Sequence, residues 1–555
     1  MKGKIEGILQ DVFKSLGYDE TIKIVSSKFD DFQCDVLFTM AKKYHDSPIS
    51  IGKRVVEEVY KLDNFSHYFK SVEIKGAGFI NICVSDEFIN ECLKDLIDDF
   101  GFKSRNKTVI LDYGGPNVAK PLHVGHLRSA IIGQAINNIL KFTGYKTISD
   151  VHLGDFGLQM GQVIYGILHD FENVDDASIN LDYLNEVYPK ISALCKEDDD
   201  VKNECLLITK ELQNGNEVYR KLWKKICDIS VSDIKSTYDY LSVHFDLWLG
   251  ESDSYKYYDE LFKIFEDKKV VKTDDGAKII EVAEDDDKIT IPPCIVQKSD
   301  GAYLYATSDL GTIYQRKKDY DPDNIIYITD NRQELHFTQV FRACKKSQIY
   351  DGVLEHYGFG TVNGTDNKPF KTRTGGTMKL NDLIEEVKRE FVSLRVENKN
   401  MSSEDIDIIV NAIIKFADLQ NDLTRNYIFD ISKFCNVNGK TGPYILYTYL
   451  RISKLLSSND GILSNSIYND IDRKLRLKLL DAHDVIEMAS LERKPHFIAN
   501  YLYELCVIGN SFYESNKMSG LDEFTKNDYD IVLSFNNHVI ETLLGLLGIK
   551  IPKKM

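Results

Sequence analysis

The chain has 555 residues, of which 43% are hydrophobic and 28% are charged, a composition typical of soluble globular proteins. This composition excludes a largely disordered or fibrous protein, and at roughly 150 residues per domain the length predicts three or four domains. The net charge of −17 excludes a generic nucleic-acid-binding protein, although a local basic patch could still bind a specific nucleic acid.

The sequence carries no sign of a membrane or secreted protein. It has no run of about 18 apolar residues, the length that a membrane-spanning helix needs, and its first residues lack the apolar stretch of a signal peptide. The ten cysteines are scattered singly without a C-x-x-C pair, which argues against a zinc ribbon or a redox motif. We therefore expect reduced thiols and a cytoplasmic location.

Residues 1–101 mix helical and strand patterns and predict an α+β N-terminal domain. Val72–Ile74 alternates as a strand does, and a second short apolar run follows the glycine-rich turn that begins at Gly76. An acidic helical segment ends just before Gly101, where we place the domain boundary.

The opening of a nucleotide-binding α/β fold follows this boundary. Thr108–Tyr113 predicts a strand, Gly114–Pro116 breaks it, and an amphipathic helix runs from about His126 to Phe142. This order of strand, loop and helix predicts a Rossmann-like catalytic domain with a parallel sheet over residues 102–380.

A long insertion at about residues 170–290 splits the catalytic domain. It is strongly acidic, and its pattern is mostly helical, so its charge runs are expected to form solvated surface. Strand-like runs return at Tyr303–Tyr305, at Ile325–Ile328 and around Phe359–Val362.

The remaining residues, 381–555, predict an all-helical region. Asp382 and Glu385, three residues apart, indicate a capping box at the start of its first helix. The run Arg473–Lys478 is basic within an acidic chain, and it could bind phosphates or simply form an exposed helix face.

Two histidines form the sharpest motif of the sequence. His123 and His126 stand on either side of Gly125, between a strand and the start of a helix. A helix N-terminus presents free N–H groups and a positive dipole, which suit a phosphate, and glycine lets a nucleotide approach the backbone closely. The histidines could donate hydrogen bonds to phosphate oxygens in a transition state. This spacing also occurs by chance, but the preceding strand and the nearby Lys120 favour a phosphate site.

A second motif, Lys368–Gly376, is a short basic loop rich in glycine ahead of the helix expected from Asp382. Lys371 and Arg373 could neutralise a triphosphate, and the glycines would let the loop move. The alternative is an ordinary solvent-exposed loop.

Together these motifs resemble the paired signatures of class I aminoacyl-tRNA synthetases, and the string from Asp112 to Arg128 resembles arginyl-tRNA synthetases in particular. The resemblance covers nearly the whole chain and is weakest over residues 170–290. It implies ATP-dependent ligation of L-arginine to its tRNA through an arginyl-adenylate. Further blocks that resemble the family are Gly76–Asn81, His152–Gly157, Tyr305–Asp309, Gln333–His336, Gly358–Gly360, Thr441–Tyr444, Tyr501–Leu505 and Leu546–Met555.

The resemblance also implies the site residues. The second signature of the class is usually K-M-S-K-S, whereas this chain has Pro369–Arg373 without the second lysine, and the family suggests that Lys120 supplies the missing charge. A guanidinium is best bound by planar carboxylates, which Asp112 and Asp309 offer. The expected catalytic residues are Lys120, His123, His126, Lys371 and Arg373; the ATP-binding residues are Gly125, His123, His126, Phe359 and Val362; the arginine-binding residues are Asp112, Asn117, Tyr305, Asp309 and Gln333.

The implied partners are L-arginine, ATP with Mg²⁺ as co-substrate, and the arginine tRNA, which the family needs even for arginine activation. No tightly bound protein metal is expected, and the protein is expected to be a monomer. Residues 1–101 resemble the tRNA-contacting N-terminal domain of the family, and residues 381–555 resemble its stem-contact and anticodon-binding region. The alternatives are another nucleotidyl transferase of the same fold, which would lack such outer domains, and a non-catalytic relative, which would not need the intact site residues.

Overall fold

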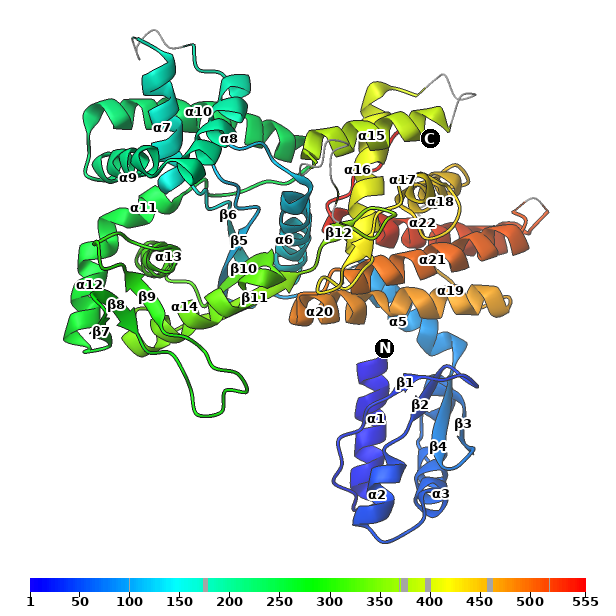
Figure 1. Cartoon of the computed structure of the whole chain (residues 1–555). Coiled ribbons are helices and arrows are strands. Elements are labelled where there is room, and N and C mark those ends of the chain that lie inside the picture. Colours follow the sequence, from blue (N-terminus) through cyan, green and yellow to red (C-terminus); the bar gives the residue numbers. More distant parts are fainter. Residues whose placement is uncertain are drawn as a thin grey trace. The chain divides into compact units, whose positions relative to one another are not determined.

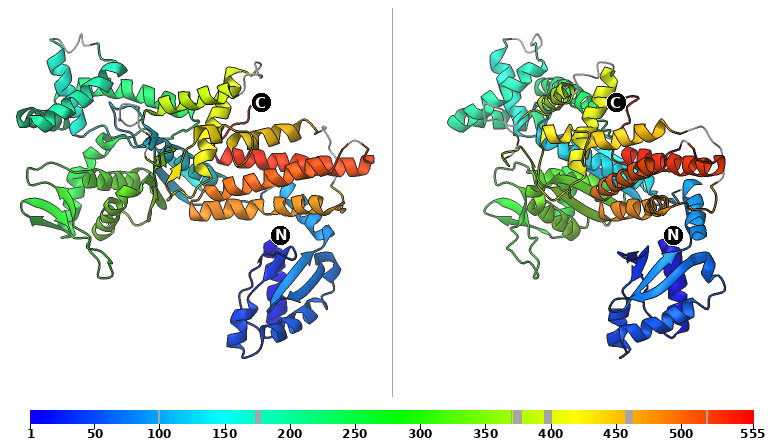
Figure 2. Two further views of the ribbon diagram at one scale, coloured as in Figure 1. Left: turned by 45° about the vertical axis from the view of Figure 1, so that its right-hand side comes forward. Right: turned by 90° about the vertical axis from the view of Figure 1, so that its right-hand side faces the viewer.

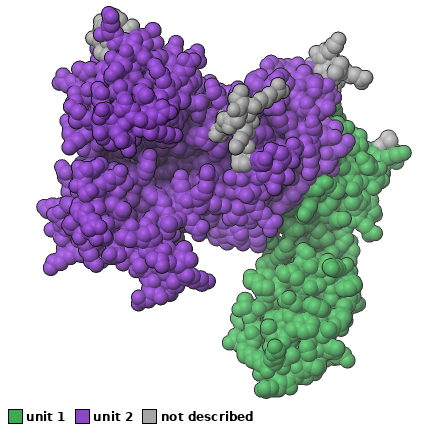
Figure 3. Space-filling model, in the orientation of Figure 1, with its two compact units in different colours: residues 1–102, 447–487, 501–542 green, residues 103–446, 488–500, 543–555 purple. Residues whose placement is uncertain are grey.

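The structure, a computed structural model, describes residues 1–98, 100–172, 178–368, 370, 378–394, 401–456, 463–518 and 520–555. These residues form two compact units, which Figure 3 shows in different colours. Unit 1 comprises residues 1–102, 447–487 and 501–542, and unit 2 comprises residues 103–446, 488–500 and 543–555. The helical C-terminal part of the chain thus contributes to both units.

The N-terminal part of unit 1 is an antiparallel sheet with the strand order β1-β2-β4-β3, covered by helices. Gly76 and Gly78, both with positive φ, turn the chain between β3 and β4, which confirms the predicted pair of strands. The elements are α1 (Lys2–Ser15), β1 (Val25–Ser26), β2 (Phe32–Cys34), α2 (Leu37–Lys43), α3 (Pro48–Val59), α4 (Phe65–Tyr68), β3 (Phe69–Lys75), β4 (Phe79–Val84) and α5 (Asp86–Asp98).

Long helices complete unit 1. Three of them, α19 (Asp470–Leu480), α21 (His496–Ser515) and α22 (Glu523–Leu546), run side by side in Figures 1 and 2. The basic run Arg473–Lys478, for which phosphate binding and an exposed helix face were both left open, lies on α19 and is largely engaged inside the unit. Arg473 pairs with Asp31 and Asp86, and the fully buried Arg476 pairs with Asp472. These arginines therefore stabilise packing. Of these C-terminal helices, only α19 lies wholly in unit 1; the helices that contribute to both units are α18 (Gly442–Ser453), α20 (Ala482–Glu492), α21 and α22.

Unit 2 is built on a parallel sheet with the strand order β11-β10-β5-β6 (Figure 1). The strands are β5 (Thr108–Tyr113), β6 (Lys146–Asp150), β10 (Asn324–Asp330) and β11 (Val353–Phe359). The strand predicted at Thr108–Tyr113 is confirmed, and its centre is fully buried, as expected in a parallel sheet. The chain leaves β5 toward β6 on one side and returns as β10 on the other, so the strand order reverses between β5 and β10.

Helix α6 (Val124–Phe142) packs directly on β5. A Cβ atom on Gly133 would lie 2.1 Å from the ring of Tyr113, so only glycine permits this approach. The predicted strand, loop and helix are therefore confirmed. Ligands of open parallel sheets bind beyond the carboxyl ends of the strands where the order reverses, which here is the loop between β5 and α6.

The remaining elements of unit 2 surround this sheet. They are α7 (Leu158–Asp170), α8 (Leu181–Glu197), α9 (Asp199–Gln213), α10 (Glu217–Tyr240), α11 (Glu251–Ser254), η1 (Tyr255–Tyr257), α12 (Tyr258–Asp267), β7 (Val271–Asp274), β8 (Ala277–Ile280), β9 (Cys294–Gln297), α13 (Tyr305–Tyr320), η2 (Asn331–Gln333), α14 (Glu334–Ser347), β12 (Val362–Asn363), α15 (Leu380–Ser393), α16 (Ser403–Leu419), β13 (Tyr427–Ile428) and α17 (Ile431–Phe434). Within the described residues, no helix is long and apolar enough to cross a membrane.

Two local predictions were wrong, and one was incomplete. The insertion is mostly helical, as predicted, but it also contains the antiparallel strands β7 and β8, which β9 follows in the same sheet; the signal for them was the Asp275–Gly276 turn with positive φ at both residues. Tyr305 begins helix α13 instead of ending a strand. Helix α15 begins at Leu380, not with a capping box at Asp382, because the Leu380 N–H donates to the carbonyl of Leu122 and fixes the start.

Candidate active site

A cavity of about 540 Å³ opens in unit 2 at the carboxyl ends of β5 and β10. Lys120 and Val362 do not line it, and Lys371 and Arg373 lie outside the described residues. In Figure 3 the surface of unit 2 is hollowed on the left of the view, between its upper and lower parts. The predicted site residues that line the cavity are Asp112, Asn117, His123, Gly125, His126, Tyr305, Asp309, Gln333 and Phe359.

The two histidines cap helix α6 reciprocally. The Gly125 N–H donates to Nδ1 of His123 over 3.0 Å, and the His123 N–H donates to Nδ1 of His126 over 3.1 Å. The rings stack with their centroids 3.8 Å apart. Because each Nδ1 accepts a hydrogen bond, the proton of each neutral ring is on Nε2. Both histidines therefore have Nε2–H as the donor that remains for a ligand.

Both rings are neutral at pH 7. Burial lowers the pKa of His126 to about 3, and the charges of His123 and Lys120 add to that effect. Burial also lowers the pKa of His123, with further contributions from Lys120 and Arg332. The histidines can thus donate hydrogen bonds without carrying positive charge, which must come from the helix dipole and from nearby lysine or arginine side chains.

Lys120 lies close to this pair, on the loop between β5 and α6. Its Nζ is 4.3 Å from the ring centroid of Tyr188 on α8, a cation–π contact. The helical insertion therefore contacts the lysine that the sequence assigns to the phosphates. Tyr188 was not predicted, because it lies in the part of the chain where the resemblance is weakest.

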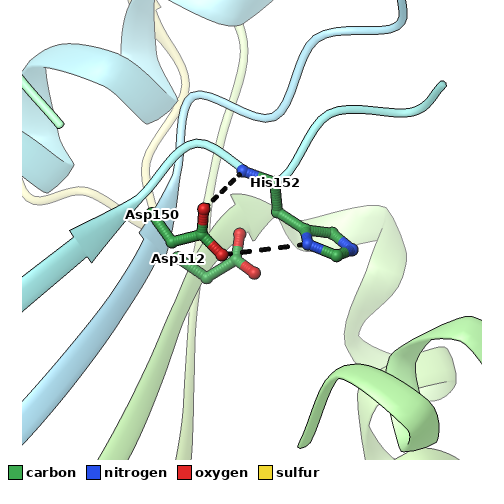
Figure 4. Close-up of side chains that lie close together, drawn as sticks. All are labelled: Asp112, Asp150 and His152. Carbon is green, nitrogen blue, oxygen red and sulfur yellow. Dashed lines mark hydrogen bonds and ion pairs between the residues drawn. The ribbon is translucent and has the colours of Figure 1, made fainter. Parts of the chain in front are cut away.

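Asp112 lies at the end of β5, opposite Asp150 at the end of β6. Figure 4 shows these carboxylates together with His152, a group whose ligand atoms are close enough to hold a metal ion. However, Nη2 of Arg316 donates to Asp112 over 2.6 Å and to Asp150 over 2.7 Å. Since a guanidinium already lies between the carboxylates, we assign no metal here. Burial raises the pKa of Asp112, and the charge of Arg316 opposes this rise.

Asp309, on α13, faces the cavity from the other side. It accepts a hydrogen bond from Nε2 of His336 over 2.6 Å. Burial alone would lower the pKa of His336, but the bond with Asp309 outweighs it and raises the pKa. His336 was quoted only as part of a family block, so the pairing with Asp309 is new information from the structure.

Glu251, at the start of α11, is a cavity residue that the sequence analysis missed. Burial raises its pKa to about 7; the charge of His152 opposes this, and Asp155 and Asp309 add to it. Its backbone N–H donates to the carbonyl of Leu153, which brings the end of the insertion to the sheet. The local sequence does not distinguish Glu251 from the solvated acids around it.

Phe359 and Val362, both predicted to bind ATP, differ in their position relative to the cavity. Phe359, at the end of β11, is 5% exposed and lines the cavity, and the guanidinium of Arg128 lies 5.7 Å from its ring centroid. Val362 belongs to β12 and pairs with Tyr427 of β13. The cavity thus joins neutral donors at one end to half-buried carboxylates at the other.

This arrangement, at the strand reversal of a nucleotide-binding sheet, defines a class I aminoacyl-tRNA synthetase. Residues 94–431 match the family "tRNA synthetases class I (R), catalytic domain", residues 1–84 match "Arginyl tRNA synthetase N terminal domain", and residues 445–555 match "DALR anticodon binding domain".

Similar proteins agree with these matches. An arginine–tRNA ligase of Alkaliphilus oremlandii is 40% identical over 100% of this chain and 99% of its own length. One of Agathobacter rectalis is 39% identical over the full length of both. The crystal structure of arginyl-tRNA synthetase from Plasmodium falciparum has a TM-score of 0.84 at 25% identity and covers 100% of this chain and 99% of its own. The chain belongs to the arginyl-tRNA synthetase family, and it catalyses the ATP-dependent ligation of arginine to tRNA.

The reciprocal cap allows the two roles of His123 to be separated. Asparagine is a strong N-cap residue, so His123→Asn should keep α6 stable while removing the Nε2–H donor. We expect the rate of arginine activation to fall by ~10²–10³ with an unchanged melting temperature. His123→Ala should lose both activity and stability. Wild-type turnover of His123→Asn at saturating ATP would contradict the donor role.

Proposed function

We propose that arginine binds in the cavity with its guanidinium between Asp309 and Glu251 and its carboxylate toward the start of α6. The observation that carries this placement is the division of the cavity into an end with half-buried carboxylates and an end with uncharged donors. A guanidinium keeps its charge and prefers carboxylates, whereas the α-carboxylate must reach the phosphate of ATP.

The other predicted arginine-binding residues support this placement. Asn117, Tyr305 and Gln333 line the same cavity and offer polar groups for the backbone of the substrate. Arg316 binds only Oδ2 of Asp112 and is shared with Asp150, so one cation stands against two carboxylates. The remaining negative charge favours a cationic substrate, and we propose that Asp112 contributes to arginine binding in this way.

The first step is adenylation. A carboxylate oxygen of arginine attacks the α-phosphorus of ATP in line, the bond to the β-phosphate breaks, and pyrophosphate leaves. Such a step needs positioning and positive charge more than a protein nucleophile. We propose that Nε2–H of His123 and of His126 donate to phosphate oxygens as charge develops there. In the second step, a terminal ribose hydroxyl of the tRNA attacks the carbonyl carbon of the adenylate, and AMP leaves.

Positive charge for the phosphates is assigned to Lys120, Lys371 and Arg373, with Mg²⁺ entering as part of the ATP co-substrate. The charge of Lys120 lowers the pKa of both histidines, which supports a role for this lysine close to them. The described residue Met378, which follows the basic loop, accepts a hydrogen bond from the Val124 N–H at the start of α6. The adenosine is assigned to the surface around Gly125 and Phe359, with Val362 behind it.

We also propose the setting of the reaction. Residues 1–101 would contact the body of the tRNA, and residues 381–555 would contact its stem and anticodon; the matched N-terminal and anticodon-binding families support this. We propose that the protein acts as a monomer. The described cysteines form no disulfide with one another, which supports a cytoplasmic location.

The assay for the placement is arginine-dependent ATP–pyrophosphate exchange, with and without tRNA. Asp309→Asn keeps the shape of the side chain but removes a charge that would face the guanidinium. Truncating one partner of a desolvated charge pair costs ~2–5 kcal/mol, or about 30-fold and more in affinity. We expect KM for arginine to rise accordingly while KM for ATP stays near wild type. An unchanged KM for arginine would reject the placement.

The raised pKa of Glu251 predicts a pH dependence with a definite sign. Near pH 6 the carboxyl is mostly protonated, and a guanidinium favours the carboxylate, so binding must release a proton there. KM for arginine should therefore fall about tenfold between pH 6 and pH 8. Glu251→Gln should bind arginine more weakly but lose most of this dependence. The same slope in both proteins would show that another group titrates.

Lys120 and Lys371 can be compared directly. If Lys120 supplies the charge that the second signature lacks, Lys120→Ala should lower kcat at least as much as Lys371→Ala does. KM for ATP should rise as well only if Lys120 also contributes to ground-state binding. Tyr188→Leu, which removes the ring beneath Lys120, serves as a milder control. A nearly silent Lys120→Ala would reject the compensation.

A further inference from the structure

Arg316 lies directly behind the cavity, and the reaction as described gives it no role beyond partly neutralising Asp112 and Asp150. Its side chain is 1% exposed, and Nη2 donates to Oδ2 of both Asp112 and Asp150. Its Nε and Nη1 are buried without a partner among the described residues. The side chain is therefore held by two charge-assisted hydrogen bonds from a single nitrogen.

The carboxylates that Arg316 binds belong to a row of side chains near the carboxyl ends of three adjacent strands. Asp112 pairs in register with Asp150 on β6 and with Tyr327 on β10. Side chains in register on adjacent strands point to the same face, and the guanidinium of Arg316 also lies 5.5 Å from the ring centroid of Tyr327. Figure 4 shows the two carboxylates next to each other. Without a cation between them, these buried like charges would repel.

Helix α13 connects this row to the substrate. Arg316 follows Asp309 by seven residues, so the two side chains lie on the same face, two turns apart. Thr312 lies between them, with its Oγ1 3.4 Å from Nε2 of His152. Where Arg316 meets the sheet therefore determines the depth and rotation of α13, and with them the point at which Asp309 enters the cavity.

We propose that Arg316 is a positioning residue for arginine recognition. Its guanidinium fixes the position of α13 and so places the Asp309 carboxylate where it can bind the substrate. It also occupies Asp112 and Asp150, which the guanidinium of the substrate would otherwise bind in an unproductive place. This inference rests on the proposed placement of arginine between Asp309 and Glu251. It follows from chemistry that is alike at the two positions: each offers two carboxylates to a planar cation, Asp112 and Asp150 buried, Asp309 and Glu251 half-buried.

The test is Arg316→Ala in ATP–pyrophosphate exchange. We expect KM for arginine to rise on the order of tenfold or more, because small displacements of positioning groups are costly, while KM for ATP changes little. Guanidinium chloride at low millimolar concentration should restore KM, since the free ion offers the same donors, whereas potassium chloride should not. Arg342→Ala is the control: it removes an arginine of α14 that pairs with Asp287 and Glu284, and it should keep the wild-type KM.

A second variant covers the case in which Arg316→Ala does not fold. Arg316→Met combined with Asp150→Asn removes the cation and one of the facing carboxylates together, so no repelling pair remains. It should also show a raised KM for arginine. A wild-type KM for arginine in either folded variant would overturn the inference, as would a defect that guanidinium does not relieve in Arg316→Ala. If Asp309→Asn also leaves KM unchanged, the placement of arginine itself fails; if Asp309→Asn raises KM and the Arg316 variants do not, only the positioning role fails.

Discussion

The structure of the active site depends on one constraint: the first turn of α6 is capped by the same two side chains that we propose as donors to the phosphates. Capping uses Nδ1 of His123 and of His126, which leaves Nε2–H on each ring for a ligand. The usual capping residues would satisfy the helix equally well but would offer no such donor. The stability of α6 and the orientation of the donors are thus set by the same hydrogen bonds.

Charge is divided across the cavity in a way that suits its two substrates. At the α6 end, burial keeps the histidines neutral, and the ATP that we propose to bind there would meet fixed donors and the helix dipole. At the other end, burial works in the opposite direction on acids, and Glu251 is left close to its titration point until a cation arrives. The same low-polarity surroundings therefore produce opposite charge states at the two ends, because desolvation disfavours whichever form is charged.

Much of this could be predicted from the sequence, but not all of it. The strand at Thr108–Tyr113 and the helix after it were predicted because their apolar pattern and glycine breaks are local signals. Glu251 and Arg316 were missed because their roles arise from contacts distant in the sequence: Glu251 with Leu153, and Arg316 with Asp112 and Asp150. For Asp112, the sequence showed a suitable carboxylate but could not show that an arginine of the same chain already binds it.

The strand order of the catalytic sheet has a consequence for how the protein is made. Strand β5 pairs with β10, which is completed only at Asp330, more than two hundred residues later along the chain. At typical synthesis rates of ~5–20 residues per second, roughly 10–40 s separate the two strands. During that time one edge of β5, rich in valine, isoleucine and leucine, has no strand to pair with. The nascent chain is therefore open to chaperone binding and to aggregation over this interval, and the helical insertion, made in the meantime, is the first large part of the domain able to fold.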